Sequence, residues 1–310
     1  MSGDFELAWY DVTQIDTLNE VTDGILETTG AWGPLALAYE RAKFGIGQSR
    51  MTHSGNSQSK TIDKRTKLWG LYELDLVPMK YSSSPAWDWW SIVKNAFYGI
   101  AAEPAAPALR PGTLSLGAKL NYSSPQYWTL LGCKHTQIQL SGKITEDPLS
   151  LKISGMSRFV TKDSTNYVQG SATRLADPPK DPIIPSNDVS IYLDGTEQTQ
   201  NVEDFTLTLA RAFKQMGRDN TNGLAFRTFA PRGFTGKLEL NMGSSSLAQL
   251  DKFLADLNVT VEMRIQNSTG GKKIQFTAGK NQDASQEHKK EDQSLLKLDI
   301  DGSSFLVTTL

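Results

Sequence analysis

The sequence predicts a mainly β protein built from two tandem β-sandwich or half-barrel domains, each with one flanking α-helix. Strict alternation of apolar and polar residues recurs along the chain, which gives a strand one dry face and one wet face. Such alternation is typical of antiparallel sandwich or barrel sheets, whereas strands of a doubly wound parallel sheet are apolar on both faces. The alternating segments are 72–76, 149–153, 205–209, 238–242, 259–265 and 296–300.

Two segments carry helical periodicity. Residues 85–98 follow the serines 82–84, and residues 247–257 follow the serines 244–246. A serine in that place can cap the first turn of a helix, which is worth about 1 kcal/mol. Each helix has one apolar stripe, which we expect to lie on a sheet. The stripes are Trp89, Ile92, Val93, Ala96 and Phe97 in the first helix, and Leu247, Leu250, Phe253, Leu254 and Leu257 in the second.

Irregular segments divide the chain. Residues 177–185 hold four prolines, too many for a central strand, and mark a linker. Residues 47–66 are predicted to form a long polar loop, and residues 101–111 are rich in Ala and Pro. Residues 280–293 are charge-dense and are interpreted as a solvated hairpin tip rather than a binding loop. The predicted organisation is an acidic N-terminal arm (1–30), a first domain (31–176), a Pro-rich linker (177–186) and a second domain (187–310).

The surroundings of the two helices predict an internal duplication. Gly70–Leu76 aligns with Gly236–Met242, and each is followed by three serines, a helix and an alternating strand. The glycines are 166 positions apart (236 less 70), which indicates a duplicated domain rather than a solenoid with repeats of about 20–50 residues. Coincidence between two unrelated β domains is the alternative. A pair of strands closes each copy. We align the pair formed by 136–140 and 149–153 in the first copy with the pair formed by 296–300 and 305–309 in the second.

Duplication has a geometric consequence for assembly. Contacts that run head to tail close into rings or grow as filaments. If a module of this kind packs in a ring of six, a fused pair makes the ring from three chains.

Charge and composition exclude several classes of protein. Lys and Arg number 32 against 34 Asp and Glu, a net charge of −2, so no bulk attraction to DNA or an anionic membrane is expected. The chain starts without a secretory signal, and no apolar stretch approaches the roughly 20 residues that cross a bilayer. One cysteine and three histidines argue against a disulfide or a zinc site: Cys133, His53, His135 and His288. We expect a protein made in the cytosol without metal or cofactor.

No arrangement of residues predicts an enzyme. Glu73 and Asp75 share the wet face of one strand, which a solvated surface explains better than an acid/base pair. Cys133 and His135 point to the same face of another predicted strand, but Cys133 is better explained as a core residue than as a nucleophile. Phosphate-binding glycine motifs are absent from the sequence.

An aromatic cluster on the first predicted helix is the remaining candidate for a binding site. It could stack sugars or bases, but docking of the indoles into a core or a neighbouring subunit is the preferred interpretation. The cluster consists of Trp87, Trp89 and Trp90.

Several segments, in their order along the chain, resemble the tail tube (major tail) proteins of long-tailed bacteriophages, in particular those with two fused tube domains. Glu27–Pro34 is similar to a segment near the start of such proteins. Leu131–Gly142 followed by Pro148–Gly155 resembles one of their strand pairs. Asn201–Leu209, with Gly233–Leu240 behind it, is similar to the opening strands of the second domain.

The resemblance implies a structural role. It implies homotrimeric rings with pseudo-sixfold symmetry, whose neighbouring strands join into an inner barrel and which stack helically through the arm 1–30 and the loop 47–66. The implied partners are further copies of the chain, the tape-measure protein, the tail terminator and the baseplate or tip proteins. DNA would pass through the tube without specific binding. Each DNA phosphate that Lys or Arg neutralises adds affinity and slows passage, so a chain of near-neutral charge suits this role. The implied location is the virion tail, after synthesis in the host cytoplasm, with no membrane contact.

Two other functions stay open. The chain could be a β-sandwich module of a virion or cell surface that binds carbohydrate or a receptor through the Trp-rich helix and the loops. It could also be the inner tube of a contractile secretion machine, although such subunits are usually single-domain.

Overall fold

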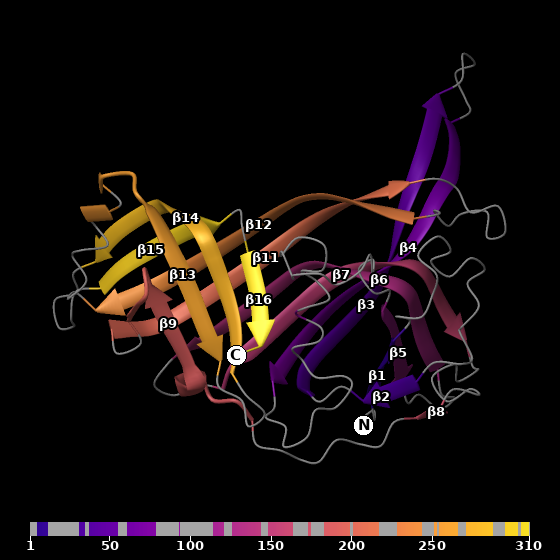
Figure 1. The fold of residues 1–310 in the computed structure, drawn as a ribbon. Helices are drawn as coiled ribbons and strands as arrows, with labels where there is room; N and C mark the ends of the chain where they lie inside the picture. The colour runs from indigo at the N-terminus through magenta and orange to yellow at the C-terminus, as the bar shows by residue number, and fades with distance from the viewer. Residues whose placement is uncertain are drawn as a thin grey trace.

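The computed structural model describes strands almost throughout, and the prediction of a mainly β fold is confirmed (Figure 1). The described strands belong to a 16-stranded sheet. The structure describes residues 5–11, 31–34, 37–54, 61–78, 93, 114–120, 126–143, 148–163, 173–174, 183–198, 201–216, 228–243, 251–252, 254–265, 271–287, 295–302 and 305–309. The elements are β1 (Phe5–Asp11), β2 (Ala31–Pro34), β3 (Leu37–Ser54), β4 (Thr61–Pro78), β5 (Leu114–Leu120), β6 (Gln126–Lys143), β7 (Ser150–Asp163), β8 (Thr173–Arg174), the 3-10 helix η2 (Ser186–Asp188), β9 (Val189–Leu193), β10 (Thr196–Glu197), β11 (Val202–Met216), β12 (Thr228–Gly243), β13 (Asn258–Ile265), β14 (Lys272–Glu287), β15 (Leu295–Gly302) and β16 (Phe305–Thr309).

The two halves of the chain repeat one strand order. Hydrogen-bonded neighbours run β3-β4-β7-β6-β5-β1-β2 in what we call the first module. They run β11-β12-β15-β14-β13-β9-β10 in the second module. Every pair within a module is antiparallel. β16, which pairs with the first half of β14, takes the place that the second half of β7 has beside β6.

Irregularities in the ladders recur at equivalent positions. A β-bulge shifts the register by one residue and bends the strand, so its position depends on local side chains. Three shifts in the first module have counterparts in the second, which unrelated domains would not share. The pairs are Tyr39/Arg41 with Val202/Asp204, Leu114/Leu116 with Val259/Val261, and His135/Gln137 with Asn281/Asp283. The chain therefore contains the same module twice.

The alignment of the terminal strands was wrong by one strand. Ile138 of β6 pairs with Ile153, and the equivalent contact in the second module joins Ala284 of β14 to Leu298. The counterpart of 136–140 is thus the end of β14, within the segment 280–293 that was predicted as a hairpin tip. β14 continues to Glu287, and residues 288–293 lie outside the described residues. Charged residues on an edge strand gave this segment the composition of a loop.

The predicted loop 47–66 is also mostly strand. β3 and β4 form a hairpin that stays paired as far as His53 with Ile62 and Ser54 with Thr61. The hairpin of β11 and β12 is its counterpart and stays paired out to Met216 with Thr228. Figure 1 shows both hairpins extending from the sheet toward the upper right.

Each module folds into two layers around an apolar core. The first half of β14 pairs with β13 and β16, and its second half pairs with β15, so the strand passes from one layer to the other at its bulge. Figure 1 shows β13 and β16 crossing in front of β11. Core side chains are at most a few per cent exposed, and burial of each is worth about 1.5–3 kcal/mol. In the second module they include Ile191, Leu193, Phe205, Leu207, Leu238, Leu240, Val261, Met263, Ile274, Phe276, Leu298 and Ile300.

Both predicted helices lie largely outside the described residues. Val93 is helical and fully buried, which agrees with the first stripe. In the second segment Asp251, Lys252 and Leu254 are helical. Leu254 and Leu257 are 74% and 53% exposed, so their predicted burial was wrong.

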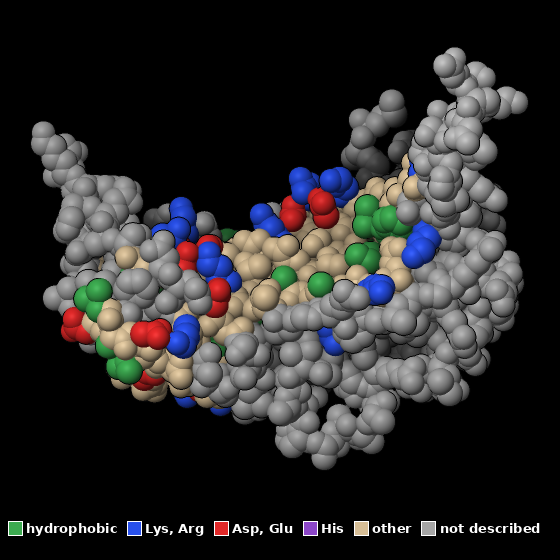
Figure 2. All heavy atoms as spheres, turned by 90° about the horizontal axis from the view of Figure 1, so that it is seen from above, with side chains coloured by type: hydrophobic (Ala, Val, Ile, Leu, Met, Phe, Trp, Pro, Cys, Tyr) green, Lys and Arg blue, Asp and Glu red, His purple; other side chains and the backbone are tan. Residues whose placement is uncertain are grey.

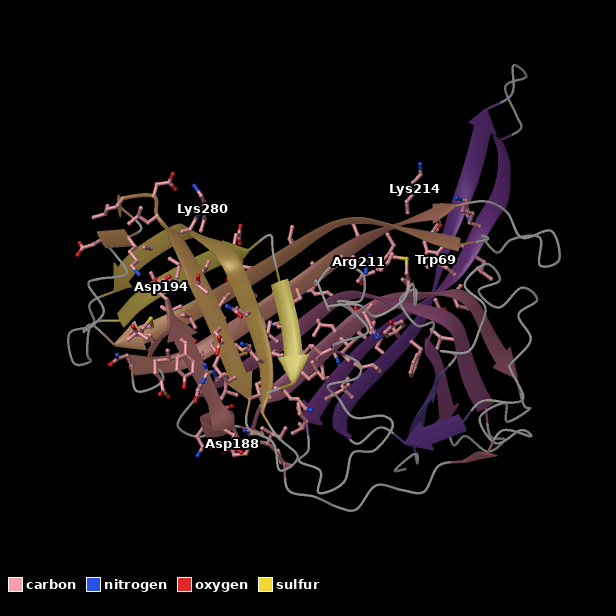
Figure 3. All side chains as sticks on the ribbon, viewed as in Figure 1. Trp69, Asp188, Asp194, Arg211, Lys214 and Lys280 are labelled. Atoms are coloured by element: carbon pink, nitrogen blue, oxygen red, sulfur yellow. The ribbon has the colours of Figure 1, made fainter. Side chains whose placement is uncertain are left out.

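Ion pairs tie the end of this helical segment to the turn between β9 and β10 and to β14. Asp256 has a φ of 50°, a left-handed conformation that ends a helix. Lys252 pairs with Asp194 in the turn between β9 and β10, and Lys280 of β14 pairs with Asp256 at 3.1 Å. Figure 3 shows Asp194 and Lys280 at the same end of the second module.

Parts of the predicted arm and linker belong to the sheet. Residues 5–11 of the arm form β1, which pairs with β5 from Phe5 opposite Leu120 to Asp11 opposite Leu114. Near the end of the linker, the N–H of Ile184 donates to the carbonyl of Pro78 at 3.0 Å, and its carbonyl accepts from Leu149 at 2.9 Å. The start of the second module is thereby held against the first.

Candidate assembly interface

The two modules are joined edge to edge by β6 and β11. These strands pair antiparallel from Lys143 opposite Asp204 to Gln137 opposite Ala210. β6 comes from the first module and β11 from the second, so the ladder crosses from one copy of the module to the other. We call this contact the internal joint.

Apolar side chains close the core side of the internal joint. Leu140 lies opposite Leu207 and Ile138 opposite Leu209, and all four side chains are at most 3% exposed. Gly142 makes room for a close approach, because a Cβ there would collide with Oγ of Ser186 in η2. The joint is thus packed like a domain interior.

One edge of each module takes part in the internal joint, and the other does not. β3 is the counterpart of β11, and among the described residues it pairs only with β4. Residues 281–287, the second half of β14, are the counterpart of β6 there, and among the described residues they pair only with β15. We call β3 and this half of β14 the outer edges. A strand at the edge of a sheet is in general a template for further pairing.

Apolar side chains on the outer edges are more exposed than their counterparts. Ile46 of β3 is 51% exposed, whereas Leu209, its equivalent in β11, is 3% exposed. Phe44 and Ala284 are only partly buried against the core, whereas their equivalents Leu207 and Ile138 are 1% exposed. This difference in exposure is what a neighbouring strand produces when it pairs with an edge and covers its apolar side chains.

The sheet side opposite the core is mainly polar, although Leu71 of β4, which is 39% exposed, also lies on it. We call this side, on β3, β4, β7, β6, β11, β12 and β15, the polar face. Its side chains are half-buried or exposed and include Arg41, Lys43, Glu73, Asp75, Gln139, Lys152, Thr206, Thr208, Lys237, Glu239 and Asp299.

Several cations of the polar face lie beside carboxylates. In the first module, Nε of Arg41 is 3.1 Å from Asp75 and Nζ of Lys43 is 3.3 Å from Glu73. In the second, hydrogen bonds with Glu239 and then Asp299 raise the pKa of Lys237. Exposed pairs of this kind add little stability, but they cancel charge locally.

The polar face thus carries both signs of charge in close pairs. Figure 3 shows Lys214 of β11 pointing upward from the sheet. Figure 2 views the molecule from that side and shows Lys and Arg next to Asp and Glu over part of the sheet, with hydrophobic side chains among them toward the right. Opposite charges this close produce no extended field of one sign.

Glu73 and Asp75, considered as an acid/base pair, lie on the polar face with Arg41. They border an open depression of about 220 Å³ that β6 and β7 also line. Both carboxylates lie within ion-pair distance of Arg41, so the arrangement is that of a solvated ionic cluster.

His135, considered as a partner of Cys133, is buried and contacts Tyr72. Nδ1 of His135 lies 2.9 Å from the Tyr72 hydroxyl, and the rings meet edge to face. The side chain of Cys133, the tryptophans 87, 89 and 90, and His288 lie outside the described residues. In the described part of the chain, no group of His, Cys, Asp and Glu could hold a metal ion, and no helix is long and apolar enough to cross a membrane.

We expect Tyr72→Phe to destabilise the first module. The substitution removes the buried hydrogen bond to His135, which should cost about 1–3 kcal/mol of unfolding free energy. Tyr192→Phe is the matched control, because that hydroxyl donates to Glu197 at an exposed site. Urea unfolding should shift for the first variant and stay within about 0.5 kcal/mol for the second. Equal midpoints would show that the Tyr72–His135 contact is not structural.

Sequence reasoning missed the residues of the outer edges. The signal was present, because Arg41, Lys43 and Gly45 alternate with Ala42, Phe44 and Ile46. Period-two alternation predicts a strand with an apolar face. It does not show that the strand lies at an edge.

Comparisons with known proteins identify the family. The model of the family described as phage tail tube protein matches residues 11–301. No curated protein matches the chain. Among 14 matching chains of solved structures is one from the virion of a native gene transfer agent (GTA) particle, at 10% identity and a TM-score of 0.31, covering 39% of this chain and 95% of that one. Since the family model spans nearly the whole sequence, this protein belongs to the phage tail tube protein family and is a structural protein of the virion tail.

Proposed function

We propose that three copies of this protein close into a ring through their outer edges, and that stacked rings form the tail tube. The observation that carries the proposal is the internal joint, in which two copies of the module already pair edge to edge. A contact of this head-to-tail type repeats until it closes or grows as a filament. Three fused pairs would give a ring of six modules.

The polar face supports a conduit. If rings close through the edges, the apolar core lies within the wall, and one sheet face lines the lumen. A lumen lined by paired opposite charges would hold DNA weakly, since affinity for phosphates depends on unpaired Lys and Arg. The tube would enclose the tape-measure protein during assembly and pass DNA at infection, without specific binding.

Further parts of the proposal rest on the family and the sequence. The chain would divide into an arm (1–30), whose residues 5–11 add β1 to the sheet of the first tube domain, a first tube domain (31–176), a linker (177–186) and a second tube domain (187–310). The hairpin tips and the arm would join stacked rings. Synthesis would take place in the host cytoplasm, and the tail terminator and the baseplate or tip proteins would bind the two ends. As a tail structural protein, the chain would act by assembly and not by catalysis.

Electron microscopy of the purified protein tests the proposal. We expect rings or tubes with a central hole, and threefold symmetry in end views of single rings. Stable monomers at high protein concentration would contradict it. Monomers that bind a glycan array would favour a carbohydrate- or receptor-binding module instead.

A further inference from the structure

The internal joint contains the information needed to set the register of the contact between chains. β11 and β3 are equivalent, since the bulge at Val202/Asp204 matches that at Tyr39/Arg41. β6 and β14 are equivalent, since the bulge at His135/Gln137 matches that at Asn281/Asp283. The residue pairs of the internal joint from Thr206 with Ser141 to Ala210 with Gln137 therefore each have one corresponding pair on the outer edges.

We infer that β14 of one chain pairs antiparallel with β3 of the next chain, with Ala284 opposite Ile46 and Glu287 opposite Lys43. Ala284 and Ile46 correspond to Ile138 and Leu209, and Glu287 and Lys43 correspond to Ser141 and Thr206. This inference rests on the proposed ring and adds which edges meet, in which direction and in which register. The partner surface is a second copy of this chain.

Burial on the outer edges agrees with this register. Ile46, at 51% exposure, would be covered as Leu209 is by β6. Ala284, partly buried against the core of its own module, would complete the apolar pair. Pairing of β3 with β4 fixes the face of Ile46 within its chain, so a slip by one residue would set it opposite a residue of the other face, and the alternation excludes that slip.

One position of this register brings residues of opposite charge together. Lys43 is exposed on the polar face and lies 3.3 Å from Glu73 of its own chain. In this register Glu287, a residue of opposite charge, would be its counterpart across the ladder. Opposite charges directly across a ladder favour pairing, and like charges oppose it.

The contact between chains should be weaker than the internal joint. The internal joint has Leu140 opposite Leu207, whereas its counterpart has Gln286 opposite Phe44. Ala284 likewise replaces the larger Ile138. A less apolar contact opens more readily, which lets chains exchange before a ring closes.

Disulfide trapping tests the register. Gly45 and Ser285 are expected to lie directly opposite each other on the polar face, as Thr208 and Gln139 do in the internal joint. Directly opposed Cβ atoms lie about 4.5–5.5 Å apart, close enough for a disulfide with a small adjustment, whereas diagonal neighbours are about 7–8 Å apart. A Cβ on Gly45 would meet its nearest neighbour, Cβ of Leu71, at an ordinary 3.8 Å.

The variants would be made in a Cys133→Ala background whose ring formation is checked first by electron microscopy. Gly45→Cys with Ser285→Cys should give covalent trimers on mild oxidation, which reductant returns to single chains. Gly45→Cys with Glu287→Cys, two residues along the same face, is the matched control and should cross-link at least about tenfold less.

The outcomes separate this inference from the proposed function. Rings that cross-link equally well or better through the control pair, or through neither pair, would overturn the register and leave the ring intact. A folded Cys133→Ala protein without rings would overturn both. Covalent trimers confined to the Gly45 and Ser285 pair would establish the register.

Discussion

Replacing Ile46 with aspartate is expected to abolish ring assembly and leave the unfolding of the single chain nearly unchanged. Ile46 is half-exposed in the chain and would be buried between chains. The substitution therefore costs little in the monomer, but it places a carboxylate inside the apolar side of a strand pair. Burying an unpaired charge costs about 3–5 kcal/mol at each contact, enough to raise the assembly concentration more than a hundredfold. Sedimentation velocity, together with thermal unfolding, measures both effects.

Leu209→Asp is the matched control, because Leu209 holds the equivalent position in the internal joint. Its side chain is 3% exposed, so the same charge enters the folded core of the chain. We expect loss of cooperative unfolding or a destabilisation of about 3–5 kcal/mol. If Ile46→Asp still forms rings, the outer edge is not the contact. If it unfolds the chain as Leu209→Asp does, β3 is already covered within the monomer.

Phe205→Ala is expected to give the largest loss of stability among simple truncations at the internal joint. The ring is 1% exposed, and its Cε1 would lie 3.4 Å from a Cβ built on Gly142 of the other module. Truncation removes apolar contacts on both sides of the joint and leaves a cavity, which costs about 3–5 kcal/mol. The urea midpoint of unfolding should fall accordingly.

Thr206→Ala is the control for Phe205→Ala. Thr206 is the next residue of β11, half-buried on the polar face, so its truncation should change stability by no more than about 0.5 kcal/mol. Equal effects of the two variants would contradict the assignment of the core side. A fall in only one of two unfolding transitions would show that the joint does not couple the modules.

Much of the fold could be predicted from local patterns. The alternating segments 72–76, 205–209 and 238–242 lie within β4, β11 and β12, because burial on one face imposes a period of two. The aligned glycines, Gly70 and Gly236, occupy equivalent places in β4 and β12. Duplication was recognisable because equivalent strands kept their patterning.

Edge strands and short strands could not be predicted in this way. Residues 280–287 and 47–54 carry charges and short polar side chains, and each lies toward an outer edge or in a projecting hairpin, where no second layer requires apolar residues. β1 escaped prediction because it lies in a segment with an acidic composition. Its place beside β5 depends on residues more than a hundred positions away.

The candidate interface required the structure. Sequence alternation marks which side of β3 is apolar, but exposure of Ile46 appears only when the partners of β3 are known. The register between chains came from bulges, which are set by three-dimensional packing and leave no short motif. The duplication and the resemblance to tail tube proteins pointed toward assembly without showing which strands would meet.

A density map of the assembled particle, at a resolution that separates β-strands, tests the central claim most directly. We expect one closed ladder of hydrogen-bonded strands around the lumen, in which β6–β11 pairs within a chain alternate with β14–β3 pairs between chains. Chains that touch through other strands, or a β3 edge that is covered by its own chain, would contradict it.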